Sequence, residues 1–248
     1  MAVVETDYLD VIRAEANRLI AIARMGPLDA RVPACPDWDL ATLCGHVSRV
    51  HRWATVAAAT GKQPEGGFGP KPPGGSAAID YLAEGIEPLV AALAPLTTDQ
   101  AGWTFTGTNR GGSFWPRRQA QETMVHRWDA ESAVGTPTPF EPRLAADGLF
   151  EVFRVLTPFR VTSRTALPVF PGDIHLHATD VHSEWVIDAP GGSFSISDAH
   201  RKCAVAVRGT ASDLLLFMWR RVGPDHPGIE IIGDEAAAFA LHESRLLG

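Results

Sequence analysis

A proline-rich segment, Gly-Thr-Pro-Thr-Pro-Phe-Glu-Pro at residues 135–142, separates two parts of the chain whose apolar residues repeat with different periods. Before it, apolar residues recur every three or four positions, which is typical of amphipathic helices. After it, several short stretches alternate apolar and polar residues, which is typical of strands with one buried face. A proline-rich break between two such patterns indicates a domain boundary. We therefore expect an α+β chain of two domains, at residues 1–138 and 139–248.

The first part predicts a four-helix bundle. Asp39 is a good N-cap for the second helix, because its side chain can accept hydrogen bonds from exposed backbone amides. Pro116 suits the first turn of the fourth helix, where a missing amide costs nothing. The four expected helices span residues 5–25, 39–59, 76–94 and 116–134.

A loop rich in glycine and proline, residues 61–75, joins the second and third of these helices and cannot form regular structure. A loop of this length in a compact domain is usually either disordered or a lid over a site. It is therefore a candidate wall for any pocket in the first domain.

The second part predicts a small α+β domain. We expect helices at residues 144–157, 212–221 and 234–246, and strands at residues 173–179, 184–187, 193–197, 202–207 and 228–232. His175 and His177 alternate with apolar residues, so they should share one face of the sheet. Strands of this kind commonly expose polar side chains to solvent, and this interpretation is favoured over metal binding.

The composition limits the classes of partner. The 248 residues are 45% hydrophobic and 21% charged, which is ordinary for a globular protein, and the net charge of −7 argues against nucleic-acid binding. No apolar run approaches the ~20 residues that a membrane span needs, and the amino terminus does not resemble a secretory signal. Three widely spaced cysteines fit reduced thiols. We expect a cytoplasmic protein that acts on a small molecule.

Three residues from two predicted helices have the chemistry of an open metal site. Glu122 and His126 are four positions apart, so they share one face of a helix and can reach one ion. His46 lies at the edge of an apolar helical stripe and can join them from a facing helix. Two histidines and one glutamate leave one zinc position free, which is typical of catalytic sites. Asp129, one turn beyond His126, could orient an imidazole through a hydrogen bond.

Three motifs resemble the mycothiol-dependent maleylpyruvate isomerase family, and they follow one another in that family's order. Residues 115–131 (Trp-Pro-Arg-Arg-Gln-Ala-Gln-Glu-Thr-Met-Val-His-Arg-Trp-Asp-Ala-Glu) resemble its metal-binding helix. Residues 32–40 (Val-Pro-Ala-Cys-Pro-Asp-Trp-Asp-Leu) resemble the turn that leads to its first histidine, here His46. Residues 207–221 (Val-Arg-Gly-Thr-Ala-Ser-Asp-Leu-Leu-Leu-Phe-Met-Trp-Arg-Arg) resemble a third, downstream motif.

The resemblance implies a fold and a chemistry. The fold would be a DinB-like helical bundle followed by a small α+β domain of the sterol-carrier-protein kind. The chemistry would use mycothiol as a thiol cosubstrate. In the family's founding reaction the thiolate adds to the cis double bond of maleylpyruvate, the resulting single bond rotates, and elimination returns the thiol with the trans product. We expect an isomerase of this kind or a thiol S-transferase that acts on an electrophilic small molecule.

Arginines are the candidate cations for the negative charge that the substrate accumulates as the thiolate adds. Arg221 aligns with the arginine that ends the family's downstream motif. Arg220 precedes it where small residues are common, so the assignment is open between the two. Arg117 and Arg118, in the first turn of the predicted fourth helix, are a second cationic patch and candidates for binding the cosubstrate.

Three alternatives remain open at the level of sequence. Metal-bound water instead of a thiolate would make the protein a zinc hydrolase or amidase, although no His-Glu-x-x-His motif is present and Glu122 is used as a ligand. Two histidines and a carboxylate also describe non-haem iron sites, so iron or another divalent metal is an alternative to zinc. A non-catalytic, ligand-binding module could keep zinc for structure only.

Overall fold

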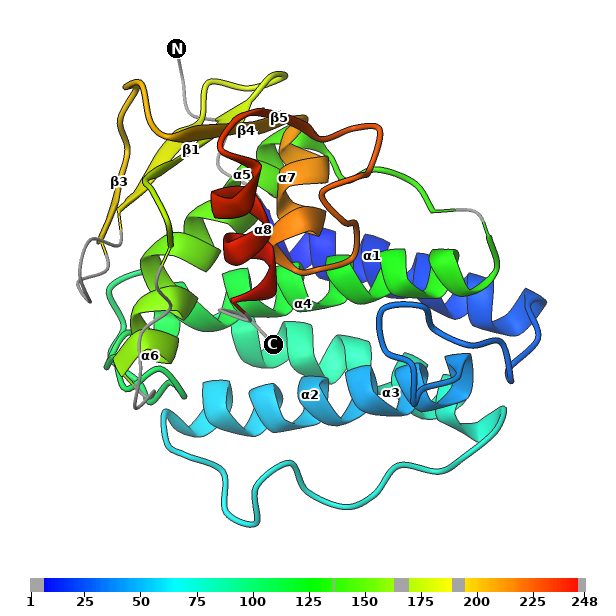
Figure 1. The fold of residues 1–248 in the computed structure, drawn as a ribbon. Helices are drawn as coiled ribbons and strands as arrows, with labels where there is room; N and C mark the ends of the chain where they lie inside the picture. Colours follow the sequence, from blue (N-terminus) through cyan, green and yellow to red (C-terminus); the bar gives the residue numbers. More distant parts are fainter. Residues whose placement is uncertain (1–6, 136, 163–169, 189–194, 245–248) are drawn as a thin grey trace. The chain divides into compact units, whose positions relative to one another are not determined.

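The computed structural model describes residues 7–135, 137–162, 170–188 and 195–244 (Figure 1). The chain divides into two compact units, one ending at Thr138 and the other beginning at Pro139. Small parts of three predicted elements lie outside the described residues, namely residues 5–6, 193–194 and 245–246.

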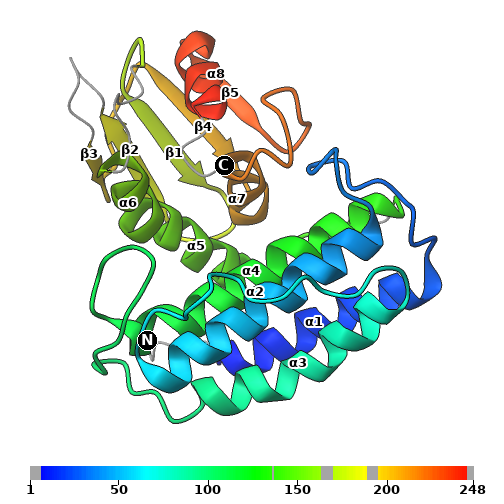
Figure 2. The ribbon, with the colours of Figure 1, turned by 90° about the horizontal axis from the view of Figure 1, so that it is seen from below.

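The first unit is a bundle of four helices, as the sequence predicted (Figure 2). The helices are α1 (Tyr8–Met25), α2 (Leu40–Thr60), α3 (Ala77–Leu93) and α4 (Gly111–Ala133). Asp39 caps α2, since its Oδ1 accepts a hydrogen bond of 2.7 Å from the amide of Thr42. Asp7 caps α1 in the same way. Polar side chains thus satisfy amide groups that a helix start leaves without intrahelical partners.

The fourth helix begins five residues earlier than its proline indicated. Gly111 and Gly112 form its first turn, and Pro116 lies inside the helix. Both glycines meet other backbone closely: a Cβ on Gly112 would lie 1.9 Å from the carbonyl oxygen of Thr97, and one on Gly111 would lie 3.0 Å from the Cα of Gly102. These glycines therefore serve close packing at the start of the helix, which the prediction from Pro116 did not include.

Apolar side chains from all four helices fill the centre of the bundle. Fully buried examples are Leu19 of α1, Leu43 of α2, Leu82 of α3 and Met124 of α4. Burying each such side chain contributes on the order of 1.5–3 kcal/mol. Among the described residues, no helix is both long and apolar enough to cross a membrane.

The loop of residues 61–75 lies along α2 in a defined conformation. Phe68 packs on Trp53, with 4.8 Å between ring centroids, and Arg49 donates a hydrogen bond of 3.3 Å to the carbonyl oxygen of Gly69. Pro72 lies against Gly45, where an added Cβ would be 3.0 Å from its ring. The loop was expected to be either disordered or a lid over a site, and the structure shows an ordered loop.

The second unit contains a sheet of five strands within the described residues, in the order β3-β2-β1-β4-β5. The strands are β1 (Ile174–Ala178), β2 (Glu184–Asp188), β3 (Ser195–Ser197), β4 (Val205–Gly209) and β5 (Glu230–Gly233). β1 pairs with β4 in parallel, and the remaining pairs are antiparallel. The α+β class is therefore confirmed.

Helical segments complete this unit. They are α5 (Pro142–Glu151), the π-helical turn η1 (Val152–Leu156), α6 (Thr157–Thr162), α7 (Ala211–Met218) and α8 (Glu235–Glu243). The helix expected at residues 144–157 is thus longer and passes through a π turn. Phe153 of η1 packs on Trp185 of β2 at 5.5 Å between ring centroids. One face of the sheet is therefore covered by helix, and His175, His177 and Glu184 belong to the other face.

Candidate metal centre

His46, Glu122 and His126 converge in the first unit. The Nε2 atoms of His46 and of His126 both lie 3.2 Å from Oε1 of Glu122. One ligand atom from each residue lies within 4.8 Å of the other two. Two imidazole nitrogens and a carboxylate oxygen form a donor set that zinc accepts, with one position left for another ligand. The residues present therefore fit the metal that the sequence predicted.

The packing of α2 against α4 produces this convergence. Glu122 and His126 are one turn apart on α4, so their side chains share a face. His46 comes from α2, and its ring lies 5.0 Å from that of His126 between centroids. His46 and Glu122 are partly exposed, at 33% and 19% of their side chains, whereas His126 is 9% exposed. The centre is thus open to solvent from the side of His46.

Two further side chains orient His126 and Glu122. Nδ1 of His126 lies 2.9 Å from Oδ2 of the fully buried Asp129, and a carboxylate only accepts, so Nδ1 carries the proton. That hydrogen bond directs Nε2 toward Glu122 and reserves it for a ligand. Arg118 donates a hydrogen bond of 3.2 Å to Oε2 of Glu122, which leaves Oε1 for the two histidines.

Glu122 and His126 each stabilise the charged form of the other. Burial alone would raise the pKa of Glu122, but the charge and hydrogen bonds of His126 and His46, together with Arg118, hold it well below its usual range. Burial would lower the pKa of His126, but Glu122 and Asp129 raise it to about 9. Glu122 is therefore ionised at neutral pH, and a metal ion must displace a proton from His126 to bind there.

Sequence reasoning did not select Trp38, whose ring packs beside both histidines of this centre. The ring of Trp38 lies 4.6 Å from that of His46 and 6.1 Å from that of His126, between centroids. Trp38 belongs to the motif at residues 32–40, so its position directly before the N-cap of α2 could have drawn attention to it. Here it limits how far either imidazole can move.

Sequence reasoning also missed His51, which is fully buried inside the bundle. Its Nε2 lies 2.9 Å from the hydroxyl of Thr123, which itself donates to the carbonyl oxygen of Gln119. Nothing in the sequence distinguishes this residue from an ordinary core histidine. It connects α2 to α4 directly beside Glu122.

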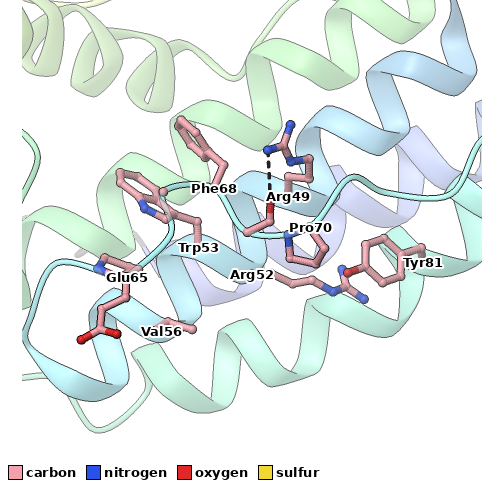
Figure 3. Close-up of a pocket in the computed structure, with 11 residues that line it drawn as sticks. Arg49, Arg52, Trp53, Val56, Glu65, Phe68, Pro70 and Tyr81 are labelled. Atoms are coloured by element: carbon pink, nitrogen blue, oxygen red, sulfur yellow. Dashed lines mark hydrogen bonds between the residues drawn. The ribbon is translucent and has the colours of Figure 1, made fainter.

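A hollow of about 150 Å³ lies between α2, α3 and the loop of residues 61–75 (Figure 3). Arg49 and Trp53 line it, and they share a face of α2 with His46, because they follow it by three and seven positions. In Figure 3 the guanidinium group of Arg52 lies over the ring of Tyr81, at 3.4 Å from its centroid. The loop thus forms one wall of a hollow that begins one turn of α2 beyond His46.

The two arginines expected to bind the cosubstrate contact different partners. Arg118 is buried on Glu122, as described above. Arg117 donates a hydrogen bond of 3.1 Å to the hydroxyl of Tyr8 on α1. They do not form the single cationic patch that their adjacency suggested, because neighbouring residues project from a helix about 100° apart.

Arg220 and Arg221 differ sharply at the end of α7. Arg220 is exposed and adopts a left-handed backbone conformation, with φ of 59°. Its amide bonds to the carbonyl of Phe217, and that of Arg221 bonds to the carbonyl of Leu216, which is the Schellman motif. Arg221 is half-buried, and its guanidinium donates to the carbonyl of Trp219 at 2.9 Å. The backbone of Arg220 forms the turn that ends α7, and the side chain of Arg221 is hydrogen-bonded to Trp219.

Comparison with known proteins covers both units. A family model described as the mycothiol maleylpyruvate isomerase N-terminal domain matches residues 9–131, and one described as the MDMPI C-terminal domain matches residues 143–239. The fold is similar to a crystal structure of the mycothiol-dependent maleylpyruvate isomerase, with 13% identity, a TM-score of 0.58 and 92% of each chain covered. The fold is also similar to the crystal structure of a histidine-to-alanine mutant of the mycothiol-dependent maleylpyruvate isomerase, with 12% identity, a TM-score of 0.59 and 92% of each chain covered. No curated protein matches the sequence.

Proposed function

Since the chain belongs to the mycothiol maleylpyruvate isomerase family, we propose that it is an enzyme that activates mycothiol for attack on an electrophilic small molecule. The observation that supports this most is the open cluster of His46, Glu122 and His126. These three residues would hold a zinc ion. When bound, zinc would keep a coordinated thiol deprotonated at neutral pH, where a free thiol with a pKa of about 8.5 is mostly protonated.

The residues around the cluster would position the reacting groups. Asp129 holds His126 in one tautomer, and Arg118 holds Glu122, so neither side chain needs to reorganise when the thiol arrives. Trp38 covers one side of both imidazoles. The hollow beside Arg49 and Trp53 offers a cationic and aromatic surface to the polar body of the thiol.

The reaction that fits best is isomerisation across a double bond or S-transfer. In isomerisation the thiolate forms a carbon–sulfur bond at one end of the cis double bond, and the electron pair moves onto the adjacent carbonyl. Rotation about the new single bond and expulsion of the thiolate then give the trans product. In S-transfer the sulfur remains on the substrate and a leaving group departs.

Arg221 is the residue we propose for stabilising the negative charge on the substrate. Its guanidinium is always protonated and can bind a carboxylate through two hydrogen bonds. Its half-buried position fits this role better than the exposed Arg220, whose backbone forms the turn that ends α7.

A hydrolase is the second candidate, and the geometry favours it less. Activation of water by general base catalysis needs a basic side chain directed at that water. Glu122 already contacts two imidazoles and Arg118, and Asp129 contacts His126. Both carboxylates of the centre are therefore engaged in holding it together.

The test is turnover of a panel of electrophiles, including maleylpyruvate and an alkylating agent, with and without mycothiol. A parallel panel of amides and esters is assayed without thiol. We expect reaction only with mycothiol present. Cleavage of an amide or ester that ignores added thiol would refute the proposal and favour the hydrolase. No turnover with either panel, combined with a zinc site that excludes thiols, would favour a non-catalytic module.

A further inference from the structure

A second cluster of side chains of the types that bind metals lies in the other unit, on the face of the sheet that η1 does not cover. His175, His177, Glu184 and His200 each offer a ligand atom within 4.8 Å of the other three. The sequence favoured a solvent-facing role for His175 and His177 and did not select Glu184 or His200. His175 is in fact 7% exposed, so this face is not simply solvated.

Glu184 is the centre of the cluster. Its Oε2 lies 2.9 Å from Nε2 of His175 and 2.5 Å from Nδ1 of His200, and its Oε1 lies 3.1 Å from Nδ1 of His177. Three imidazole nitrogens thus point at one carboxylate. Ligands around a tetrahedral ion with bonds of about 2.0–2.1 Å lie about 3.4 Å apart, so a small movement outward makes room for one ion.

The sheet itself places three of these four residues. His175 and His177 are two apart on the central strand β1, so they project from the same face. Glu184 is the residue opposite His177 in the antiparallel pairing of β1 with β2. Side chains at such paired positions are neighbours on one face, which makes this part of the cluster as rigid as the strands that carry it.

The connection from β3 to β4 brings the fourth residue. Because β2 and β1 lie between those strands, residues 198–204 must cross the sheet, and the ring of His200 lies 5.4 Å from that of His175. Ion pairs anchor the crossing on both sides of His200. Asp198 pairs with Arg154 at 2.8 Å, and Arg201 pairs with Asp173 and Asp188.

We propose that this cluster is a second metal site, which binds a divalent transition-metal ion of the zinc class through three imidazoles and one carboxylate. Imidazole ligands suit zinc, nickel and copper, whereas magnesium and calcium prefer oxygen alone. Four protein ligands distinguish it from the three-ligand centre of the first unit and are typical of a structural ion. The ion would tie the β3–β4 crossing to the hairpin of β1 and β2.

Access to the cluster is open. His200 is 78% exposed at its side chain, and a surface hollow of about 320 Å³ beside His177 and Glu184 is lined by the turn between β1 and β2. The exposed His182 lies in that turn outside the cluster. It is therefore a matched control for removal of a nearby histidine.

The experiment counts and locates bound ions in the full chain after metal removal by a chelator. Zinc titration by calorimetry and elemental analysis of the wild type should give two ions per chain. His46→Ala/His126→Ala should keep one. Adding His177→Ala and His200→Ala to that variant should abolish binding at the second site, whereas adding His182→Ala should not. In the His46→Ala/His126→Ala background, bound Co²⁺ should show the absorption of a four-coordinate site.

A second measurement covers the case in which the multiple variants do not fold. In an otherwise wild-type chain, His200→Ala should lower the zinc content from two to one and weaken the remaining affinity of the second site at least tenfold. Zinc should also slow amide exchange of residues 198–204 in the wild type and not in His200→Ala. A zinc content unchanged by His200→Ala and His177→Ala, or no zinc left in His46→Ala/His126→Ala, would overturn the proposal.

Discussion

The buried His51 should make the first unit sensitive to acid in a pH range where carboxylates are still ionised. Thr123 donates its hydroxyl proton to Gln119, so it must accept from Nε2 of His51, and Nδ1 then stays unprotonated. Nδ1 is buried and has no hydrogen-bond partner among the described residues. Protonation would create a buried charge without an acceptor. Burial lowers the pKa of His51 to about 4; the charge of Glu122 opposes this shift, and the charges of Arg52, His126 and His46 add to it.

The sign and size of the effect follow from linkage between protonation and folding. The pKa of His51 is about 6.5 in the unfolded chain and about 4 in the folded chain, so between these values the unfolded state binds more protons. The stabilisation is complete above about pH 6.5 and is lost as the pH falls toward 4. Full loss corresponds to about 3.4 kcal/mol, of which about 2 kcal/mol disappears between about pH 7 and pH 5.

The matched variant is His51→Gln, which can still donate to Thr123 and cannot titrate. Urea unfolding, followed by far-UV circular dichroism in the presence of a chelator, gives the free energy of unfolding of both proteins at each pH. Between about pH 7 and pH 5, the free energy of unfolding of the wild type should fall by about 2 kcal/mol more than that of the variant. Parallel pH profiles, with a constant difference, would refute the argument.

Three further predictions concern the candidate metal centre, the arginines and the start of α4. His46→Ala, Glu122→Ala and His126→Ala should each lose tight zinc binding at the first site, because they supply its three ligands; elemental analysis with an unchanged zinc content in the His46 variant would remove this site. Arg221→Ala should keep zinc and helicity while losing turnover, whereas Arg220→Gly should keep turnover and gain about 1 kcal/mol of stability by relieving the left-handed backbone. The reverse pattern in kinetic assays would assign the role to Arg220. Gly112→Ala should destabilise by about 1–3 kcal/mol, since its Cβ would meet the carbonyl oxygen of Thr97, and Gly74→Ala, with open space around it, should stay within about 0.5 kcal/mol. Equal urea midpoints for these two glycine variants would contradict the packing argument.

Features that depend only on residues close together in the sequence could be predicted without the structure. Helical periodicity placed α1, α2 and α3 within a few residues, because the burial of one face repeats every turn. The spacing of Glu122 and His126 put them on one face for the same reason. Alternation along residues 174–178 likewise predicted that His175 and His177 share a face of the sheet.

Contacts between distant segments were decided by the tertiary structure alone. Gly111 and Gly112 were outside the predicted fourth helix, and the structure includes them because they approach the backbone of Gly102 and Thr97 closely. His51 is an ordinary helical residue until packing buries its Nδ1 without a partner. Glu184 and His200 join His175 only through strand register and the path of the crossing between β3 and β4. Local propensity acts over a few residues, whereas register and crossing are set by burial of the whole sheet, which no single segment encodes.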